Sequence, residues 1–256
     1  MKNEILKIEN LTKTYTNGKK SSTIINNLNL TIGQGEFVCI LGPSGCGKST
    51  LIRCIASFED YKGSVTSNGK VVKKPSTDRI MVFQDFNQLY PWKTVEKNIQ
   101  YPLKLQGIKD KKRLKEISDE VLKKVDLDGK QRLYPHELSG GMKQRVAIAK
   151  ALALKPDIIL MDEPFAALDA MTRNNLQKEL LDLYNQEKMT LIFITHNIQE
   201  AIVLGTRVLM MNKRGEIIID EQNPLPKPCK PSTPGYGEIW QKFSTALENE
   251  NSKIKD

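Results

Sequence analysis

The 256-residue chain is poor in the residues that build metal centres and disulfide frameworks. Its four cysteines form no Cys-x-x-Cys pair, and only two histidines accompany them. This scarcity argues against a zinc site. It also favours reduced, mostly buried thiols in a reducing compartment. The cysteines are Cys39, Cys46, Cys54 and Cys229.

Long apolar stretches are missing as well. A membrane-spanning helix needs about 20 consecutive apolar residues, and the apolar runs at 158–161 and 208–211 are far shorter. Residues 1–7 lack the apolar segment of a secretory leader. We therefore expect neither a membrane span nor a signal peptide in this sequence.

Aromatic residues make up 6% of the chain, whereas basic residues are in excess. The 39 lysines and arginines outnumber the 30 acidic residues and give a formal net charge of +9. Such a charge favours an anionic partner, which could be a phosphate compound, a nucleic acid or a lipid surface. The basic run at 109–115 has no interleaved aromatic residues, so we interpret it as a solvated helix face and expect no nucleic-acid partner.

Short apolar segments alternate with helical ones along most of the chain. Buried strands are expected at 37–41, 158–161 and 191–194, and helices at 48 to about 58 and at 140–154. Buried strands separated by helices predict an α/β core with a mainly parallel sheet.

Three further regions differ from this alternation. Residues 4–40 and 63–83 read as strands, the second with a hairpin turn at Asn68-Gly69. The charged segment 94–139, interrupted by Pro102 and Gly107, predicts a separate helical lobe. Residues 223–235 are rich in proline and predict a linker or extended strap. A short helix around Trp240 and Phe243 and a charged, frayed tail should follow.

A glycine-rich segment between an apolar strand and a helix carries the strongest chemical signal. It fits the pattern G-x-x-x-x-G-K-S/T and consists of Gly42, Pro43, Ser44, Gly45, Cys46, Gly47, Lys48, Ser49 and Thr50. Small residues let backbone N–H groups surround phosphate oxygens, and the helix N-terminus adds positive charge. Lys48 would reach the β- and γ-phosphates, and the Ser49 hydroxyl would ligate Mg²⁺. A chance glycine-rich turn would not explain the strand–loop–helix context.

A pair of carboxylates ends the apolar run at 158–161. Ligands of open α/β sheets gather at the carboxyl ends of the strands, where Asp162 and Glu163 are expected. Asp162 would hold Mg²⁺, and Glu163 would polarise an attacking water as general base. The alternative is that both acids merely cap the following helix.

A serine and two glycines, Ser139, Gly140 and Gly141, precede a strongly helical stretch. They would form a second helix N-terminus that can hold an anion, although many such segments are plain helix caps. Its position between the phosphate loop and the acidic strand end is what favours anion binding over a plain helix cap.

In this order the motifs resemble the nucleotide-binding subunit of ABC transporters, over residues 4–222. The resemblance implies that Tyr15 stacks on adenine, that Gln84 senses the γ-phosphate and Mg²⁺, and that His196 is the switch histidine. It also identifies Asp169 as the D-loop aspartate. Met142 replaces the glutamine that usually ends the signature loop.

The resemblance also implies the fold and the assembly. The fold would be a phosphate-loop NTPase: a RecA-like core with an antiparallel β-subdomain and a helical lobe inserted at about 87–139, followed by the strap and tail at 223–256. Two copies, or two related subunits, would stack head to tail, with ATP and Mg²⁺ between the phosphate loop of one and Ser139-Gly140-Gly141 of the other. A separate membrane permease would place the chain at the cytoplasmic face of the membrane.

A finer resemblance is to importers of nitrate, sulfonates and taurine, carried by residues 89–95, 138–145, 164–173 and 224–243. It implies a small anionic solute and, indirectly, an extracytoplasmic solute-binding protein. Tyr90 and Asn197 depart from the pattern of that group.

An exporter ATPase remains an alternative. A soluble ABC ATPase acting on nucleic acid should carry tandem cassettes or a long coiled-coil insertion. A phosphate-loop kinase would leave 138–142 and His196 unexplained.

The segment 86–92, Phe86-Asn87-Gln88-Leu89-Tyr90-Pro91-Trp92, is unusually aromatic for a connecting loop. Exposed aromatic residues on loops are typical interface anchors. We expect these side chains to line a groove for a helix of the permease. The alternative is that Phe86 and Trp92 only pack the helical lobe onto the core.

Overall fold

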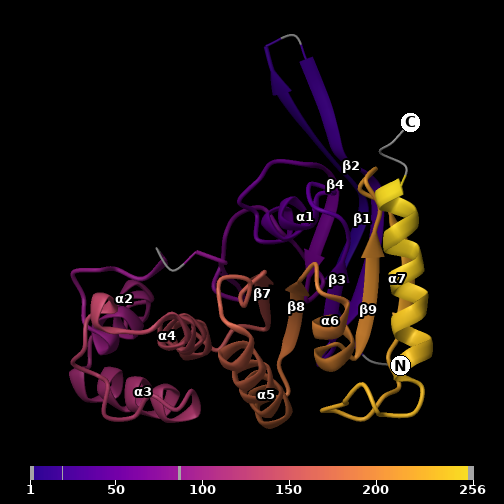
Figure 1. The fold of residues 1–256 in the computed structure, drawn as a ribbon. Helices are drawn as coiled ribbons and strands as arrows, with labels where there is room; N and C mark the ends of the chain where they lie inside the picture. The colour runs from indigo at the N-terminus through magenta and orange to yellow at the C-terminus, as the bar shows by residue number, and fades with distance from the viewer. Residues whose placement is uncertain (1–2, 19, 86–87, 253–256) are drawn as a thin grey trace. The chain divides into compact units, whose positions relative to one another are not determined.

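The structure is a computed structural model that describes residues 3–18, 20–85 and 88–252. The chain divides into two compact units, one formed by Met1–Ser76 with Glu187–Asp256 and the other by Thr77–Gln186 (Figure 1). Each unit is described by itself.

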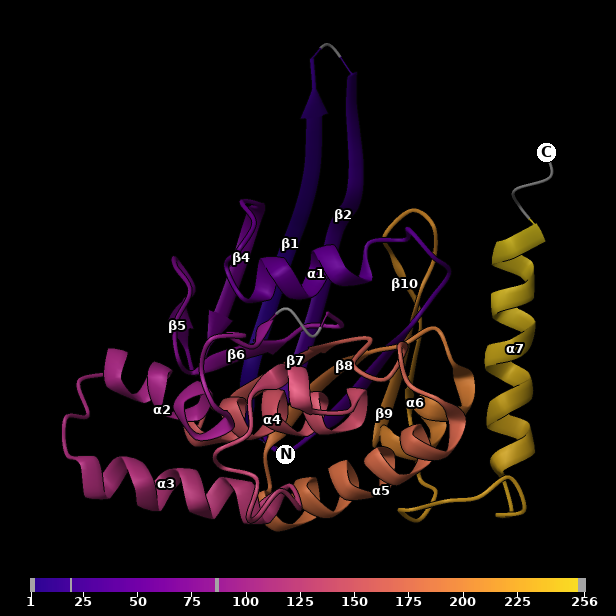
Figure 2. The same ribbon diagram turned by 60° about the vertical axis from the view of Figure 1, so that its left-hand side comes forward.

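The first unit contains an antiparallel sheet with the strand order β2-β1-β4-β5. Its two longest strands form the extended hairpin visible in Figure 2. Asn68 and Gly69 connect β4 to β5 with φ angles of 49° and 71°, so the predicted hairpin turn is confirmed. The strands are β1 (Glu4–Asn17), β2 (Lys20–Gly33), β4 (Lys62–Ser67) and β5 (Lys70–Val71).

The same unit contains a second group of strands in the order β10-β9-β3-β8. Strand β3 pairs in parallel with both β8 and β9, whereas β10 pairs antiparallel with β9. Every residue of β3 and β8 is buried, as expected for parallel strands covered on both faces. The strands are β3 (Phe37–Leu41), β8 (Thr190–Ile194), β9 (Arg207–Met211) and β10 (Ile217–Gln222).

Three helices accompany these strands: α1 (Lys48–Ile55), α6 (Ile198–Leu204) and α7 (Tyr236–Ser252). Helix α1 ends before the predicted residue 58, since Ser57 takes a left-handed φ of 60°. Helix α7 has 17 residues, so the prediction of a short helix is wrong, and the end of the predicted tail, 253–256, lies outside the described residues. Buried Phe243 anchors α7, and the strap before it packs Leu225 and Cys229 against Ile202 of α6.

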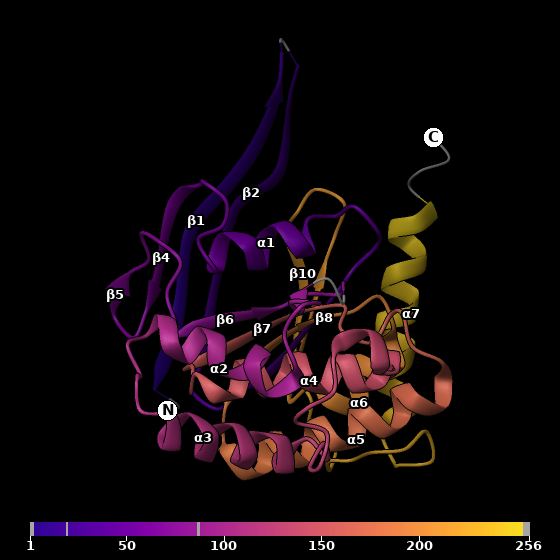
Figure 3. The same ribbon diagram turned by 90° about the vertical axis from the view of Figure 1, so that its left-hand side faces the viewer.

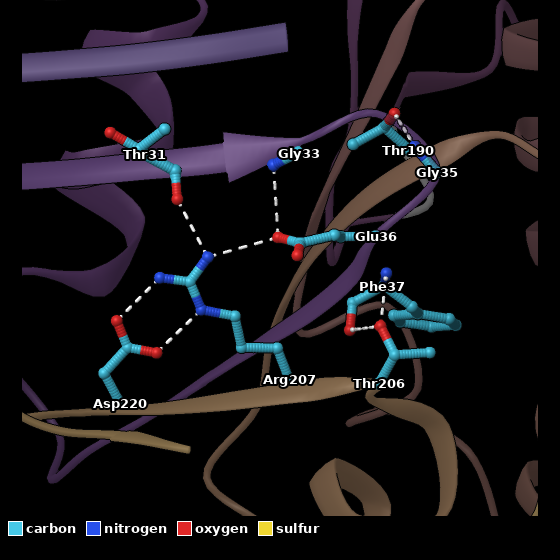
Figure 4. A network of polar contacts seen from close by, with 9 residues as sticks. All are labelled: Thr31, Gly33, Gly35, Glu36, Phe37, Thr190, Thr206, Arg207 and Asp220. Carbon is cyan, nitrogen blue, oxygen red and sulfur yellow. Dashed lines mark hydrogen bonds and ion pairs between the residues drawn. The ribbon is translucent and has the colours of Figure 1, made fainter. Parts of the chain in front are cut away.

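A polar network joins the amino-terminal ends of β3 and β9 to the carboxyl-terminal parts of β2 and β10 (Figure 4). Arg207 donates two hydrogen bonds to the carboxylate of Asp220, at 2.7 and 2.6 Å. It also bonds to the carbonyl of Thr31 at 2.8 Å and to Glu36 at 3.1 Å. One guanidinium therefore joins β2, β9, β10 and the turn before β3. The pKa of Arg207 is raised above its ordinary value, mainly by the hydrogen bonds to Asp220.

The second unit contains the parallel pair β6 (Arg79–Val82) and β7 (Ile158–Asp162). Its helices α2, α3 and α4 pack against one another (Figure 3). Pro102 was expected to interrupt the helical region but lies inside α2, which continues to Leu105. The helices are α2 (Val95–Leu105), α3 (Lys111–Lys124), α4 (Gly140–Ala153) and α5 (Ala170–Glu187).

Other sequence predictions can be compared with the structure. The four cysteines are free and buried, as predicted. The basic residues at 109–113 and 115 are exposed, with Leu114 buried between them, so the run is a solvated helix face. Within 3–18, 20–85 and 88–252, every helix is too short or too polar to cross a bilayer.

Candidate functional site

The phosphate loop, residues 42–50, follows the buried strand β3 and opens α1. A Cβ atom on Gly42 would lie 2.6 Å from the Met211 carbonyl oxygen, and one on Gly47 would lie 3.0 Å from the Ile24 side chain. Both glycines also have positive φ angles, 157° and 105°. Larger residues at these two positions would clash with the backbone and side chains behind the loop, so the tight curve of the loop depends on them.

Lys48 is 5% exposed and lies inside this curve. Its Nζ donates hydrogen bonds to the carbonyl oxygens of Gly42 and Pro43, both at 2.9 Å. The first turn of α1, Lys48-Ser49-Thr50, carries no carboxylate that would oppose an anion. A buried ammonium at the start of a helix fits a phosphate, because the ammonium and the helix N-terminus both offer positive charge.

His196 lies at the same edge of the strands as the phosphate loop. Strands β3 and β8 are parallel neighbours, Ile40 pairs with Ile194, and the Thr195 N–H donates to the Ile40 carbonyl at 3.2 Å. His196 comes next in the chain and is exposed. The structure therefore places this histidine and the loop that starts at Gly42 at adjacent strand ends.

Residues that sequence reasoning missed hold the backbone on both sides of His196. Thr195 donates to the buried carboxylate of Glu200 and accepts from the Asn197 N–H at 3.0 Å. Asn197 caps α6 by accepting from the Glu200 N–H at 3.3 Å. An asparagine followed three residues later by glutamate is a helix-start signal that could have revealed this arrangement.

Tyr15 belongs to the same unit and lies on β1. Its side chain is exposed at 40%. The Nζ of Lys13 lies 4.6 Å from the centre of its ring.

In the second unit, Gln84 and Asp162 lie at the same end of two paired strands. Val82 of β6 pairs with Met161 of β7, so Asp162, the last residue of β7, and Gln84, two residues after β6, come at the carboxyl end of this pair. Asp162 is 7% exposed, whereas Gln84 is exposed. Phe83, between strand and glutamine, is fixed by two hydrogen bonds with Gln88, at 3.2 and 3.0 Å.

Glu163 has a left-handed backbone conformation, with a φ of 44°. Its carbonyl accepts a hydrogen bond from the Ala166 N–H at 3.1 Å, which closes a turn directly after β7. Residues other than glycine take this conformation at a cost, and such strain is concentrated at functional sites. The side chain is half-buried.

Ser139 is the N-cap of α4, and its Oγ accepts from the Met142 N–H at 3.3 Å. Its side chain is exposed, so the N-terminus of α4 is open to solvent. A Cβ on Gly141 would lie 2.7 Å from the Thr172 side chain, so the helix start approaches α5 closely. Asp169 caps the start of α5, and its hydrogen bond from the Thr172 N–H is the main reason that its pKa is lowered.

The predicted site residues thus fall into two sets. The first unit holds the phosphate loop with His196 at adjacent strand ends and Tyr15 on β1. The second unit holds Gln84 and Asp162 at one strand-pair end, with Glu163 next to Asp162, and Ser139-Gly140-Gly141 at the start of α4. The described chain gathers no cluster of three His, Cys, Asp or Glu side chains that could hold a metal. Mg²⁺ commonly takes only one or two protein oxygens together with substrate phosphates, so a magnesium site needs no such cluster.

The aromatic segment is only partly described, because Phe86 and Asn87 lie outside the described residues. Trp92 is 70% exposed, and its ring lies 5.7 Å from that of Tyr90. Tyr90 also packs edge-on against Tyr101 at 5.0 Å. Leu89, by contrast, is 3% exposed and belongs to the core of this unit. The exposed part of the segment is therefore aromatic, and the aliphatic part is not available to a partner.

Comparison with known proteins gives a consistent result. The family model described as "ABC transporter" matches residues 25–166. The chain is 45% identical to an uncharacterized ABC transporter ATP-binding protein of Methanocaldococcus jannaschii, over 96% of this chain and 92% of the relative. It is 42% identical to an aliphatic sulfonates import ATP-binding protein of Bacillus cereus, over 94% and 95%. It is 41% identical to a bicarbonate transport ATP-binding protein of Synechocystis, over 86% and 79%.

Two solved structures are similar to this one. One is the dimeric structure of a post-hydrolysis state of an ATP-binding cassette bound to ADP and Pi, with a TM-score of 0.74 and 34% identity. The other is the dimeric structure of a bacterial ABC transporter cassette, with a TM-score of 0.76 and 35% identity. Both alignments cover 85% of this chain and 98% of the other. The predicted phosphate-loop NTPase fold is thereby confirmed.

Proposed function

The chain belongs to the ABC transporter family as one of its ATPases, and from this premise we propose that it powers an importer of a small anion. The observation that carries the ATP-binding part is the phosphate loop, with Lys48 buried against two loop carbonyl oxygens in a tight curve that depends on Gly42 and Gly47. The direction of transport is supported by relatives named for sulfonate import. The name of another relative, for bicarbonate transport, supports an anionic solute.

We assign the site residues as follows. Tyr15 stacks on adenine, the N–H groups of the phosphate loop from Gly42 to Thr50 bind the phosphates, and Lys48 compensates their β,γ-charge. The Ser49 hydroxyl, Gln84 and Asp162 hold Mg²⁺, which when bound offsets negative charge on the transferred phosphoryl group.

Glu163 is the general base in this proposal. Its carboxylate accepts a proton from the water that attacks the γ-phosphate. His196 stabilises the charge that develops on the phosphoryl oxygens, and Gln84 reports the presence of the γ-phosphate to the segment that follows it. The strained backbone of Glu163 and the fixed backbone on both sides of His196 support these roles.

The working form is a dimer, either of two copies or with a related subunit. Ser139-Gly140-Gly141 of one subunit binds the γ-phosphate held by the phosphate loop of the other, because the N-terminus of α4, with exposed Ser139 as its cap, carries positive partial charge. Closure with ATP and opening after hydrolysis drive the permease. The dimeric state of two similar cassettes supports this arrangement.

The remaining partners follow from the same proposal. The chain works at the cytoplasmic face of the membrane, bound to permease subunits, and a separate extracytoplasmic protein delivers the solute. Trp92, with the half-buried Tyr90 beside it, contacts the permease, since exposed aromatic side chains are frequent interface anchors. Sulfonates, taurine, nitrate and bicarbonate are the candidate solutes.

An uptake experiment tests the transport direction and the solute. A strain without this gene is given each labelled candidate anion, and uptake is measured with and without a restored gene copy. We expect uptake of one anion to be lost and to return with the wild-type copy but not with Glu163→Gln. Unchanged uptake of all candidates would contradict this solute class, and retention of a solute that the wild type expels would identify an exporter.

A further inference from the structure

Lys13 is a buried lysine on β1, with 8% of its surface exposed. Another lysine of the same strand, Lys7, pairs with Glu9 at the surface, and its side chain is 41% exposed. A buried ammonium is costly unless partners replace the water that it loses. Lys13 therefore needs an explanation that a surface lysine does not.

The partners of Lys13 lie in the segment just after α1. Its Nζ lies 2.9 Å from the Glu59 carboxylate and 2.8 Å from the Asp60 carbonyl oxygen. Burial lowers the pKa of Lys13, but the hydrogen bond and the charge of Glu59 outweigh this, so the pKa lies above its ordinary value. The ammonium is therefore charged and anchored at two points.

The third contact of Lys13 is with Tyr15. The Nζ of Lys13 is 4.6 Å from the centre of the Tyr15 ring. A cation at this distance over an aromatic ring is attracted by its negative face. The pKa of Glu59 is lowered mainly by its hydrogen bond from Lys13, with a further hydrogen bond from Tyr15 contributing.

These contacts link two places that are far apart in the sequence. Glu59 and Asp60 follow α1, whose first residue is Lys48 of the phosphate loop. Tyr15 lies on β1 and keeps 40% of its surface exposed while the ammonium covers its ring from one side. Figure 2 shows α1 beside the β1–β2 hairpin. Lys13 thus fixes the ring relative to the far end of the helix that the phosphate loop opens.

We propose that Lys13 is a positioning residue for purine recognition, which holds the Tyr15 ring where the base of a nucleotide stacks on its exposed face. The inference rests on the proposed ATP binding. It assigns Lys13 and Glu59 no contact with the nucleotide: they act through Tyr15. Their contribution should therefore depend on the base and not on the phosphates.

The test compares two ligands that share their phosphates. Binding of ATP and of inorganic tripolyphosphate, each with Mg²⁺, is measured for the full chain and for Lys13→Met. We expect Lys13→Met to weaken ATP binding by about 5- to 30-fold, which is the range expected for losing a partly desolvated cation–π contact that is held in place by anchored partners. Tripolyphosphate binding should be unchanged. Lys7→Met is the matched control, and it should change neither.

A double-mutant cycle separates positioning from a general structural role. In a Tyr15→Ala background, Lys13→Met should have no further effect on ATP binding, because the ring that it positions is gone. Equal losses in both backgrounds, or an equal loss of tripolyphosphate binding, would overturn the inference. If Lys13→Met fails to fold, Glu59→Gln replaces it and should give a smaller loss, again for ATP only.

The failure of this inference and the failure of the proposed function are distinguishable. If the wild-type chain binds neither ligand, the proposed ATP binding is wrong and the inference falls with it. If the wild type binds ATP and Lys13→Met binds it equally well, the positioning role is wrong and the proposed function stands.

Discussion

Lys48 lies where the proposed phosphate site requires a positive charge. Its ammonium is buried and bonded to two carbonyl oxygens, so it can turn to an anion that offers stronger, charge-assisted hydrogen bonds. The sequence pattern predicted this lysine, but the carbonyl contacts depend on the curve of the loop and could only be seen in the structure.

We expect Lys48→Ala to weaken Mg²⁺–ATP binding by about 10²-fold or more, because the phosphate charge loses its nearest cation. Equilibrium titration with a fluorescent ATP analogue measures this. Lys62→Ala, at an exposed position of β4, is the control and should bind normally. Wild-type affinity in Lys48→Ala would refute the assignment of the loop.

Glu163→Gln should still bind ATP but hydrolyse it about 10²- to 10⁴-fold more slowly, since the amide cannot accept the proton of the attacking water. Steady-state phosphate release measures the rate. Glu116→Gln on the exposed face of α3 is the control and should retain full turnover. If turnover of Glu163→Gln were unchanged, the general base would have to be another residue.

At the scale of elements, the Arg207 network shows what sequence patterns cannot give. Arg207, Glu36 and Asp220 are far apart in the chain, and no motif joins them. They meet because β9 lies between β3 and β10, in a register that only the folded strands define. Local signals, by contrast, predicted the buried strands and the Asn68-Gly69 turn, since apolar runs and turn residues act over a few positions.

The same contrast holds for the helices and for the candidate site. The prediction of a helix break at Pro102 was wrong. A proline inside a helix usually kinks or breaks it, but α2 continues past Pro102 to Leu105. The motif residues could be named from the sequence. The Asn197 cap beside His196 carries a local sequence signal, whereas the hydrogen bond between Thr195 and Glu200 and the left-handed backbone of Glu163 depend on how the strands end, and residue types alone did not predict them.

We expect Arg207→Met to lower the free energy of unfolding by about 2–3 kcal/mol, because it leaves Glu36 buried without its cation. Urea unfolding followed by circular dichroism measures the loss. Lys242→Met is the control: its ion pair with Glu221 is exposed, so the loss should stay below about 1 kcal/mol. Equal losses in the two variants would show that the network adds no special stability.

At the scale of the whole molecule, Trp92 is the exposed residue best suited to test binding of the permease. We expect Trp92→Ser to leave ATP binding by the isolated chain unchanged and to weaken co-purification with the permease. Leu89→Glu, an obvious choice from the sequence alone, is unsuitable because it would bury a charge in the core. Met171→Ser, at an equally exposed position elsewhere, is the control. Normal assembly with Trp92→Ser would place the permease contact at another surface.

The central claim is that ATP is hydrolysed at a site to which two copies of this chain contribute. Ser139→Arg should block hydrolysis by filling the space that the γ-phosphate of the opposite subunit needs, and Lys48→Ala should block it at the phosphate loop. In a mixed dimer of these two variants, one site combines an intact Lys48 with an intact Ser139 from the other chain.

The decisive measurement is therefore the ATPase activity of an equimolar mixture of the Lys48→Ala and Ser139→Arg chains. Random pairing gives about half mixed dimers with one intact site each, so activity should return to at most about a quarter of the wild-type value. Each variant measured separately should remain inactive. A mixture no more active than its separate components would contradict a site shared between two copies.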